Sequence, residues 1–478
     1  MKQSAIYFTI LCLTLFISSC DKQLSAPPRN ARVEGFAITN QASAQTALNG
    51  AYYRFASVTS ENADATYWNT HQLWGAMLTG ALGYAYGALD DESNANIRSG
   101  LTGTVWNESY LLINTANSVL DGVTKLRNEA FTGNRKKEIL AEAKFLRAYA
   151  NFRLLVFFGE WFKEDSPYGV LLREEPTTLS NIAKKRSSVS ESYTLILSDI
   201  DEAIANAPVT NTAYYATKWA AMVLKIRVLM MRGNPADYSS VLTMADEILA
   251  APNFQLENNP KDIFYVKGLT SSEVILAIRP QPNQEIGYYN LSGSYYPGNS
   301  GLYGASPYYQ TIMQNDPRAD WVIGPLTNAQ DYSPGVKYFN KYVPFGGAPS
   351  QTSEVSYAMR LTEVYLLKAE AILRSGGDIN DARDLIKTIK GKAGVTDFSS
   401  IDNADTHEEL LIENYYEVLR SLVAEDGLEW MTLLRFPFET VKQLRPTIVN
   451  QVQLYFPVPI SELQQNPLFG LQNPGYGN

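Results

Sequence analysis

The chain has 478 residues, 45% of them hydrophobic and 19% charged, a balance that predicts a folded protein with a large core. The net charge of −9 argues against a nucleic-acid partner, because binding to phosphates requires clustered lysine and arginine. The 30 tyrosines outnumber the 19 phenylalanines, and rings with a polar edge suit wet binding surfaces as well as cores.

The N-terminus has the pattern of a bacterial export signal. Lys2 precedes an apolar run over 5–17 that is too short to span a membrane, and the text then reads FISSC, ending at Cys20. This text resembles a lipobox, which predicts a signal peptide over 1–19, a lipid on Cys20 and a tether over 20–38. The alternative is a plain signal peptide that ends near a cysteine. A diacylglycerol and an acyl chain together would anchor the protein firmly to a bilayer.

From residue 39 onward apolar residues recur at helical spacing, so we expect a chain that is helical almost throughout. The apolar stripes predict helices over 44–55, 105–127, 138–158, 193–204, 217–232, 237–249, 359–375 and 381–393. Breakers such as Gly233-Asn234-Pro235 separate some of them into pairs. Pairs of roughly 34 residues, with alanines at their contacts, are typical of TPR-like arrays. An all-α bundle without TPR geometry is the alternative.

Two long stretches lack this helical spacing. Residues 58–104 are rich in glycine, alanine, asparagine and aromatic residues, and residues 252–357 in proline, glycine and tyrosine. Within the second stretch, 284–309 holds seven tyrosines spaced by small residues, with neither helical nor strand periodicity. Compact domains rarely contain such long irregular segments unless the segments bind something. We therefore expect them to form a ligand-binding surface.

Several motifs, in this order, are similar to those of the SusD/RagB family of nutrient-binding outer-membrane lipoproteins. They are TALNGAYYRF at 46–55, VWNESYLLINTANSVLDG at 105–122, AEAKFLRAYANFRLLVFFGEW at 141–161, NDPR at 315–318, RLTEVYLLKAEAILRSGG at 360–377 and LYFPVPISELQQNPLFGLQNPGY at 454–476. One segment departs from the family pattern. Asn414 follows Glu413 where an arginine is usual, and Glu429 stands before Trp430 where an arginine is usual. The departure leaves the local ion pairs in doubt, but the apolar positions of a helix remain.

The resemblance implies an all-α fold, a TPR-like scaffold of helical pairs with long irregular loops and little β structure. It implies one SusD-like domain over 39–478, with a TPR-like part at 39–250, a loop-rich insertion at 251–357 and a C-terminal part at 358–478. It also implies a location at the outer membrane and a SusC-like TonB-dependent transporter as partner. The ligand would be an oligosaccharide or, as in RagB-like members, a peptide. A TPR-like scaffold for another protein is a third possibility.

No sequence motif indicates catalysis or a cofactor. The two histidines, His71 and His407, lie far apart, and zinc-protease, nucleophile-elbow and phosphate-loop motifs are absent from the sequence. Glu413 and Glu417 share a helical face, as a glycosidase pair might, but such pairs usually lie on a solvated surface. The run DDESNAN at 90–96 offers oxygen ligands for calcium but lacks the glycine and final glutamate of an EF-hand, which favours a polar loop. We expect no enzyme activity, no metal and no cofactor.

The resemblance implies that the ligand face is built by residues 58–104 and 280–310. Aromatic rings stack on the C–H face of a sugar, and amide or carboxylate groups bond its hydroxyls. The predicted ligand-binding residues are Trp68, Asn69, Trp74, Tyr84, Tyr86, Asp90, Tyr295, Tyr296 and Tyr303. The tyrosines at 308 and 309 are expected to pack within their own loop. The tryptophans in helical text, Trp106, Trp161, Trp219 and Trp430, are expected to lie in the core.

Overall fold

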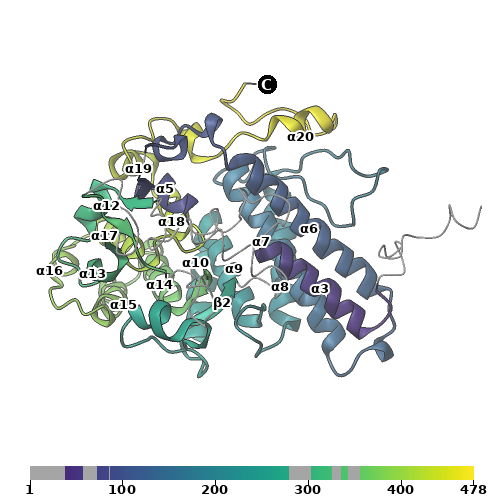
Figure 1. Ribbon diagram of the computed structural model, residues 1–478, viewed down its shortest axis with the longest axis horizontal. Coiled ribbons are helices and arrows are strands. Elements are labelled where there is room, and N and C mark those ends of the chain that lie inside the picture. The colour runs from purple at the N-terminus through teal and green to yellow at the C-terminus, as the bar shows by residue number, and fades with distance from the viewer. Residues whose placement is uncertain are drawn as a thin grey trace, which may run out of the picture.

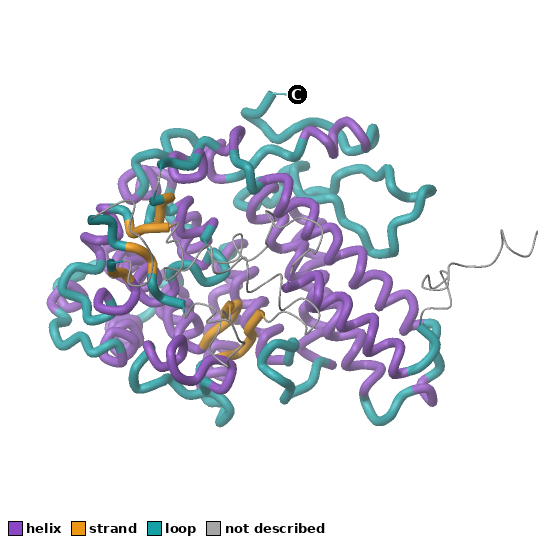
Figure 2. The backbone as a smooth tube through the Cα atoms, in the orientation of Figure 1, coloured by secondary structure: helices purple, strands orange, loops and turns teal. Residues whose placement is uncertain are grey.

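The computed structural model describes residues 38–56, 73–85, 87–278, 303–325, 335–342 and 356–477, and within these ranges helices dominate (Figures 1 and 2). The longer helices are α3 (Gln41–Ala56), α6 (Thr102–Thr124), α7 (Arg135–Phe158), α8 (Val189–Asn206), α9 (Lys218–Arg232), α10 (Pro235–Leu249), α14 (Leu361–Arg374), α15 (Ile379–Lys392) and α17 (His407–Leu422). The first eight lie where an apolar stripe predicts them. The helix α17 holds Glu413 and Asn414 of the segment of departure, whose Glu429 lies in α18 (Leu428–Leu434).

The long helices form one continuous array. The helix α3 packs on α6 and α7, and from α6 to α10 each helix packs on the next. The helix α10 then packs on α14, and α14 packs on both α15 and α17. Figure 1 shows α3, α6, α7 and α8 side by side on the right, with α14, α15 and α17 on the left. This arrangement confirms the predicted scaffold of helical pairs.

Local sequence signals set the helix ends. The Ser188 hydroxyl accepts a hydrogen bond from the Glu191 amide, and the Glu191 carboxylate accepts one from the Ser188 amide, a capping box that starts α8. The helix α9 ends at Gly233, whose φ of 70° is in the left-handed region, and Pro235 begins α10. The predicted breaker between these two helices is therefore confirmed.

Shorter elements occupy the segments between the long helices. The short helices are α5 (Trp74–Leu78), α12 (Pro307–Ile312), α13 (Ala319–Val322), α16 (Ser399–Asp402), α18 (Leu428–Leu434), α19 (Phe438–Leu444) and α20 (Ile460–Gln465). Single 3-10 or π turns are η1 (Asp90–Ser93), η2 (Asn96–Arg98), η3 (Asn128–Ala130), η4 (Ile263–Lys267), η5 (Gly268–Thr270) and η6 (Gln451–Leu454). The described parts of the irregular stretches thus contain more regular structure than their sequence indicates.

Two small antiparallel sheets complete the fold (Figure 2). The four-stranded sheet has the order β1-β3-β5-β4, with β1 (Leu82–Tyr84), β3 (Tyr303–Ala305), β5 (Tyr338–Phe339) and β4 (Ile323–Gly324). The second sheet pairs β2 (Val274–Ile278) with β6 (Ser356–Arg360). The expectation that 284–309 is irregular is wrong at its end, because 303–305 form β3 and 307–312 form α12. A three-residue strand has no visible period, and its partner is distant in sequence.

A buried turn at 423–427 joins the two halves of the helical array. Asp426, between α17 and α18, accepts hydrogen bonds from the Tyr149 hydroxyl (2.6 Å) and Arg227 Nη1 (2.6 Å). Glu425 accepts from Arg360 Nε (2.7 Å) and Lys341 Nζ (2.5 Å). Burial alone would raise the pKa of Glu425, but Arg360 and Lys341 hold the pKa below its usual range. The turn therefore connects α7, α9, β6 and the residues just after β5 through hydrogen bonds and paired charges.

Candidate functional site

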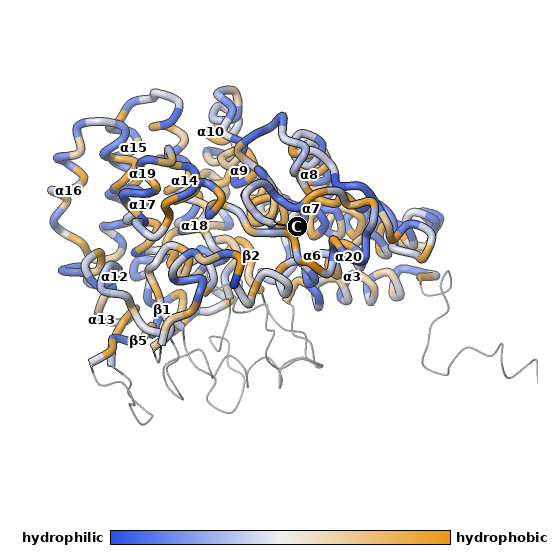
Figure 3. The backbone as a smooth tube through the Cα atoms, turned by 90° about the horizontal axis from the view of Figure 1, so that it is seen from above, coloured by the Kyte–Doolittle hydropathy of each residue, from blue (hydrophilic) through white to orange (hydrophobic). Residues whose placement is uncertain are grey.

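The four-stranded sheet brings together the two segments that are expected to build the ligand face. Strand β1 pairs with β3 in a register that sets Tyr84 opposite Tyr303. Their ring centroids lie 6.3 Å apart with the ring planes at 68°, an edge-to-face arrangement. Tyr84 is half-buried and Tyr303 is 7% exposed. In Figure 3, β1, β5, α12 and α13 gather at one edge of the molecule, opposite α10.

The Glu92 carboxylate holds the loop that follows β1. Its Oε1 accepts hydrogen bonds from the amides of Tyr84 (2.8 Å) and Leu89 (3.0 Å). Gly83 is required beside it, because a Cβ at this position would lie 2.7 Å from Glu92 Oε2. One carboxylate thus fixes the backbone of Tyr84 and closes the loop over 84–92.

Asp90 lies at the surface of this loop and Asp91 below it. The Asp90 carboxylate pairs with Arg98 Nε at 2.7 Å, and both side chains are well exposed. Asp91 is 5% exposed and accepts hydrogen bonds at Oδ1 from Trp74 Nε1 (2.7 Å) and Ser99 Oγ (2.6 Å). Among the described residues, no group of three or more His, Cys, Asp or Glu side chains is arranged to hold a metal ion.

Trp74 lies in the core and not on the ligand face, contrary to the expectation from its irregular sequence context. Its side chain is 0% exposed, and its ring stacks on Phe157 of α7 with centroids 4.4 Å apart and planes at 11°. The indole N–H is occupied by Asp91. Because Phe157 covers one ring face and Phe456 contacts the ring at 4.7 Å, no face is free for a ligand in this structure. Trp74 is therefore a core residue and not a ligand-binding residue.

Five of the predicted ligand residues lie outside the described residues, as does the predicted lipidation site Cys20. These five are Trp68, Asn69, Tyr86, Tyr295 and Tyr296. The other aromatic expectations can be compared with the structure. Tyr309 is 0% exposed in α12, and all four tryptophans expected in the core are buried, namely Trp106, Trp161, Trp219 and Trp430.

Sequence reasoning missed Arg445, which fixes the base of the sheet. Its Nε donates to the Leu78 carbonyl (3.0 Å) and to Asn94 Oδ1 (3.1 Å), and its guanidinium also contacts the Glu92 carbonyl. Gly80, with φ of 75°, lies against it, and a Cβ there would be 2.1 Å from Arg445 Nη1. Burial lowers the pKa of Arg445. A lone arginine more than 350 positions downstream gives no sequence signal for such a contact.

Asn96 provides a second link to the C-terminal segment. Its Nδ2 donates to the carbonyls of Gln453 (3.0 Å) and Tyr455 (2.8 Å). The polar run at 90–96 therefore has a structural role. Asn94 accepts a hydrogen bond from Arg445, and Asn96 donates hydrogen bonds to the backbone of the C-terminal segment. These contacts hold the segment 74–98, which includes β1, against the end of the chain.

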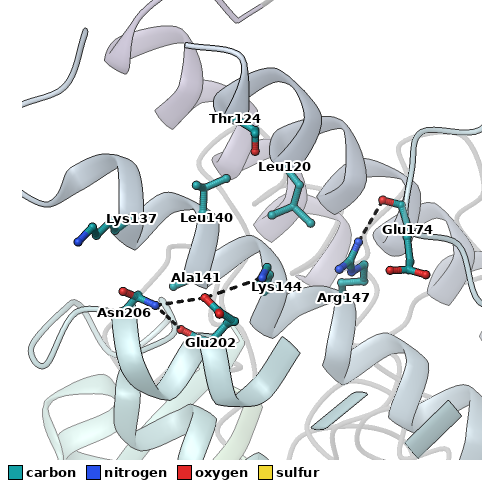
Figure 4. A pocket seen from close by; sticks show the side chains of 10 residues that line it. All are labelled: Leu120, Thr124, Lys137, Leu140, Ala141, Lys144, Arg147, Glu174, Glu202 and Asn206. Atoms are coloured by element: carbon teal, nitrogen blue, oxygen red, sulfur yellow. Dashed lines mark hydrogen bonds and ion pairs between the residues drawn. The ribbon is translucent and has the colours of Figure 1, made fainter. Parts of the chain in front are cut away.

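A separate cavity of about 450 Å³ lies away from the sheet, between α6, α7 and α8 (Figure 4). It is lined by Leu120, Thr124, Lys137, Leu140, Ala141, Lys144, Arg147, Glu174, Glu202 and Asn206. Lys144 faces Glu202 at 3.9 Å, and Arg147 donates to the Glu174 carbonyl at 3.2 Å and to Asp199. None of the predicted ligand residues that the structure describes lines this cavity, and most of its charges are paired within the protein.

Two protein-family models match the chain in successive parts. A model described as "Starch-binding associating with outer membrane" matches residues 34–230, and the SusD family model, SusD_RagB, matches residues 293–420. Together the two models cover well over half of the chain. The chain belongs to the SusD/RagB family.

Individual relatives agree with this family. A SusD-like protein of Bacteroides ovatus is 22% identical, over 66% of this chain and 64% of the relative. SusD-like protein P38 of Formosa agariphila is 26% identical, over 76% of this chain and 78% of the relative. The chain thus spans slightly less than two thirds of the first relative's length.

Solved structures of SusD-like proteins have the same fold. A SusD superfamily protein from Bacteroides thetaiotaomicron superposes with a TM-score of 0.74 at 20% identity, covering 91% of this chain and 100% of that one. Surface glycan-binding protein A from Bacteroides fluxus gives 0.72 at 18% identity, covering 91% and 99%. None of the described helices combines the length and the apolar composition that a membrane-spanning segment needs.

The SusD-type motif NDPR has a structural role in this chain. Arg318 is 2% exposed and donates to Asp316 Oδ2 (2.7 Å) and to Glu417 Oε1 (2.5 Å) of α17. Glu417 is 0% exposed, so the pair of Glu413 and Glu417 is not a solvated helix face. In this segment Glu417, one helical turn after Glu413, makes the ion pair with Arg318.

Proposed function

We propose that this protein binds oligosaccharides at the edge of the four-stranded sheet. The observation that supports this best is the pairing of Tyr84 with Tyr303, because it joins two segments that are distant in sequence at one edge-to-face ring contact, in which Tyr303 is buried and supports the half-buried ring of Tyr84. Aromatic rings at a shallow site suit the C–H faces of sugars. The family model described as starch-binding, and the neighbour named as a glycan-binding protein, favour a glycan over a peptide.

The proposed site extends from this pair into the predicted loops. Asp90 belongs to the loop that Glu92 holds, and the oxygens of its exposed carboxylate, which pairs with Arg98, suit sugar hydroxyls. We propose that the predicted residues outside the described ranges complete the site, namely Trp68, Asn69, Tyr86, Tyr295 and Tyr296. Rings would supply stacking, and the amide of Asn69 would supply a donor and an acceptor.

Affinity electrophoresis against a panel of polysaccharides and peptides tests this proposal, followed by calorimetry with the retarding ligand. Tyr84→Ala removes a ring from the surface, and we expect the Kd to rise by about tenfold, the equivalent of about 1.4 kcal/mol. Tyr214→Ala is the matched control, because Tyr214 is also half-buried and pairs with Tyr215 at 4.8 Å, outside the sheet. Retardation by peptides alone, or equal losses in both variants, would contradict a glycan site at the sheet.

We propose further that Cys20 bears a lipid that holds the protein at the outer membrane, where it passes its ligand to a SusC-like TonB-dependent transporter. The family description of outer-membrane association and the FISSC text support this. In Cys20→Ser, the protein should move from the membrane fraction to the soluble fraction. When the wild-type protein is purified from solubilised membranes, the transporter should co-purify with it. A wild-type protein that is recovered in the soluble fraction would refute the lipid anchor. A wild-type protein that is purified without any large receptor would refute the transporter partner.

The proposed activity is binding without hydrolysis. Glu417 of the carboxylate pair considered above is buried and occupied by Arg318, so it cannot act on a sugar at the surface. Incubating the bound glycan with the protein should leave its chain length unchanged by chromatography. Release of shorter products by the purified protein, but not by a heat-treated sample, would contradict the proposal.

A further inference from the structure

A second cavity, of about 370 Å³, lies where the turn between α9 and α10 meets the ends of α14 and α18 and the segment that follows α7. Three guanidinium groups line it, those of Arg232, Arg374 and Arg435, together with aromatic rings that include Trp161, Phe162 and Phe436. No carboxylate side chain is among the described residues that line it, but Asp237 pairs with Arg232 from outside the lining, with Nη2 at 2.5 Å and Nε at 2.9 Å. None of its lining residues belongs to the four-stranded sheet, so it is separate from the described part of the proposed glycan site.

One buried carboxylate holds two of these arginines in place from behind. Glu370 is 1% exposed, and its Oε1 accepts from Arg374 Nε (2.8 Å) and Arg435 Nε (2.7 Å). Burial opposes ionisation of Glu370, but the two arginines outweigh this and lower its pKa to about 2. The guanidinium groups are therefore oriented by a fixed charge that does not itself line the cavity.

The lining residues also have hydrogen-bond donors to spare. Arg374 Nη2 and Trp161 Nε1 are both buried and have no hydrogen-bond partner among the described residues. Trp161 as a whole is 6% exposed. No acceptor atom on a lining residue is similarly left over, so the imbalance is one of donors alone. A buried donor without a partner costs stability that an incoming oxygen atom recovers.

We propose that this cavity binds a carboxylate attached to a compact ring. A guanidinium fork matches the two oxygens of a carboxylate, and the aromatic lining matches the flat or C–H face of the ring beside it. The Arg374 guanidinium lies 5.6 Å from the centroid of the Phe436 ring, so a group that binds a carboxylate and a group that binds a ring are adjacent. The volume suits one monosaccharide or one small aromatic acid. A uronate and an aromatic acid share this chemistry, and the test distinguishes them.

Titration of protein labelled with ¹⁵N-tryptophan tests the proposal, because Trp161 lines the cavity and is one of only seven tryptophans. Trp161→Phe assigns its indole signal. The probes are sodium glucuronate and sodium benzoate, each with its neutral counterpart, glucose and benzyl alcohol. We expect saturable movement of the Trp161 signal with at least one acid, and binding at least about tenfold weaker for its neutral counterpart. The acid that binds more tightly shows whether the cavity takes a uronate or an aromatic acid.

Two variants separate recognition from folding. Arg374→Gln should weaken the acid by about tenfold or more, whereas Arg383→Gln on α15, a half-buried arginine that does not line the cavity, should not. Phe162→Ala should also weaken the ring-bearing acid, and its 42% exposure makes it the safer variant for folding. Movement of the Trp161 signal by neither acid, equal binding of acid and neutral probe, or no effect of Phe162→Ala would overturn the proposal. None of these outcomes depends on glycan binding at the sheet.

Discussion

Replacement of Trp74 separates a core role from a role in ligand binding. In Trp74→Ala the loss of a ring that is 0% exposed and stacked on Phe157 should reduce the free energy of unfolding by about 3–5 kcal/mol. In Trp74→Phe most of the buried surface remains, but Asp91 loses the indole donor at 2.7 Å and keeps only Ser99. Because a buried carboxylate loses one of its donors, we expect the free energy of unfolding to fall by about 1–3 kcal/mol.

Urea unfolding measures these losses, and calorimetry in the absence of urea measures glycan affinity. We expect Trp74→Phe to be less stable but to bind glycan as the wild type does, because the ring does not reach the ligand surface. Trp219→Phe is the matched control, since Trp219 of α9 is 8% exposed and its indole N–H donates to the Val209 carbonyl at 3.1 Å. Abolished glycan binding in Trp74→Phe with unchanged stability would refute the assignment of Trp74 to the core.

Three further predictions concern the supports of the site. Burial raises the pKa of Glu429 from 4.5 to about 8, so the folded state binds the extra proton and stability should fall as pH rises from about 5 to 8. Glu429→Gln, with Lys341 and Glu425 still in place, should remove this decline of a few kcal/mol, as measured by urea unfolding at several pH values. A parallel decline in the wild type and the variant would contradict the role of Glu429. Glu417→Ala should cost about 3–5 kcal/mol by leaving the Arg318 guanidinium without one of its carboxylates, and a loss below about 1 kcal/mol would disprove the buried pair. Gly80→Ala should cost more than Gly133→Ala and also weaken glycan binding, because both have positive φ but only Gly80 lies against Arg445. Equal unfolding curves for the two alanine variants would show that Arg445 does not hold the base of the sheet.

The helical scaffold could be predicted from sequence because its signals are local. The apolar stripe, the Ser188 cap and the Gly233 breaker each act over a few neighbouring residues, and the helices begin and end close to where these signals lie. Trp161 and Trp430 were expected in the core for the same reason, and both are buried.

The site was harder to predict because its determinants are distant in sequence. The sequence indicates Tyr84 and Tyr303 as separate rings, but nothing in either short strand indicates that they face each other. Trp74 was misassigned because its irregular context resembles a binding loop, and only Phe157 and Asp91 show that it is core. The sequence offered no signal for Arg445, whose contacts lie more than 350 positions away.

From the contacts of segment 74–98 with the C-terminal chain we expect a definite order of folding. Helices α6 to α10 meet partners that are close in sequence, so their pairs form at a small cost in loop entropy. The sheet, in contrast, needs Asn96 to reach Tyr455, 359 positions downstream, and Arg445 to reach Leu78 over 367 positions. Contacts of such sequence separation form late and slowly. The proposed sugar surface is therefore completed only when the end of the chain has docked, and hydrogen exchange should find it opening before the helices that support it.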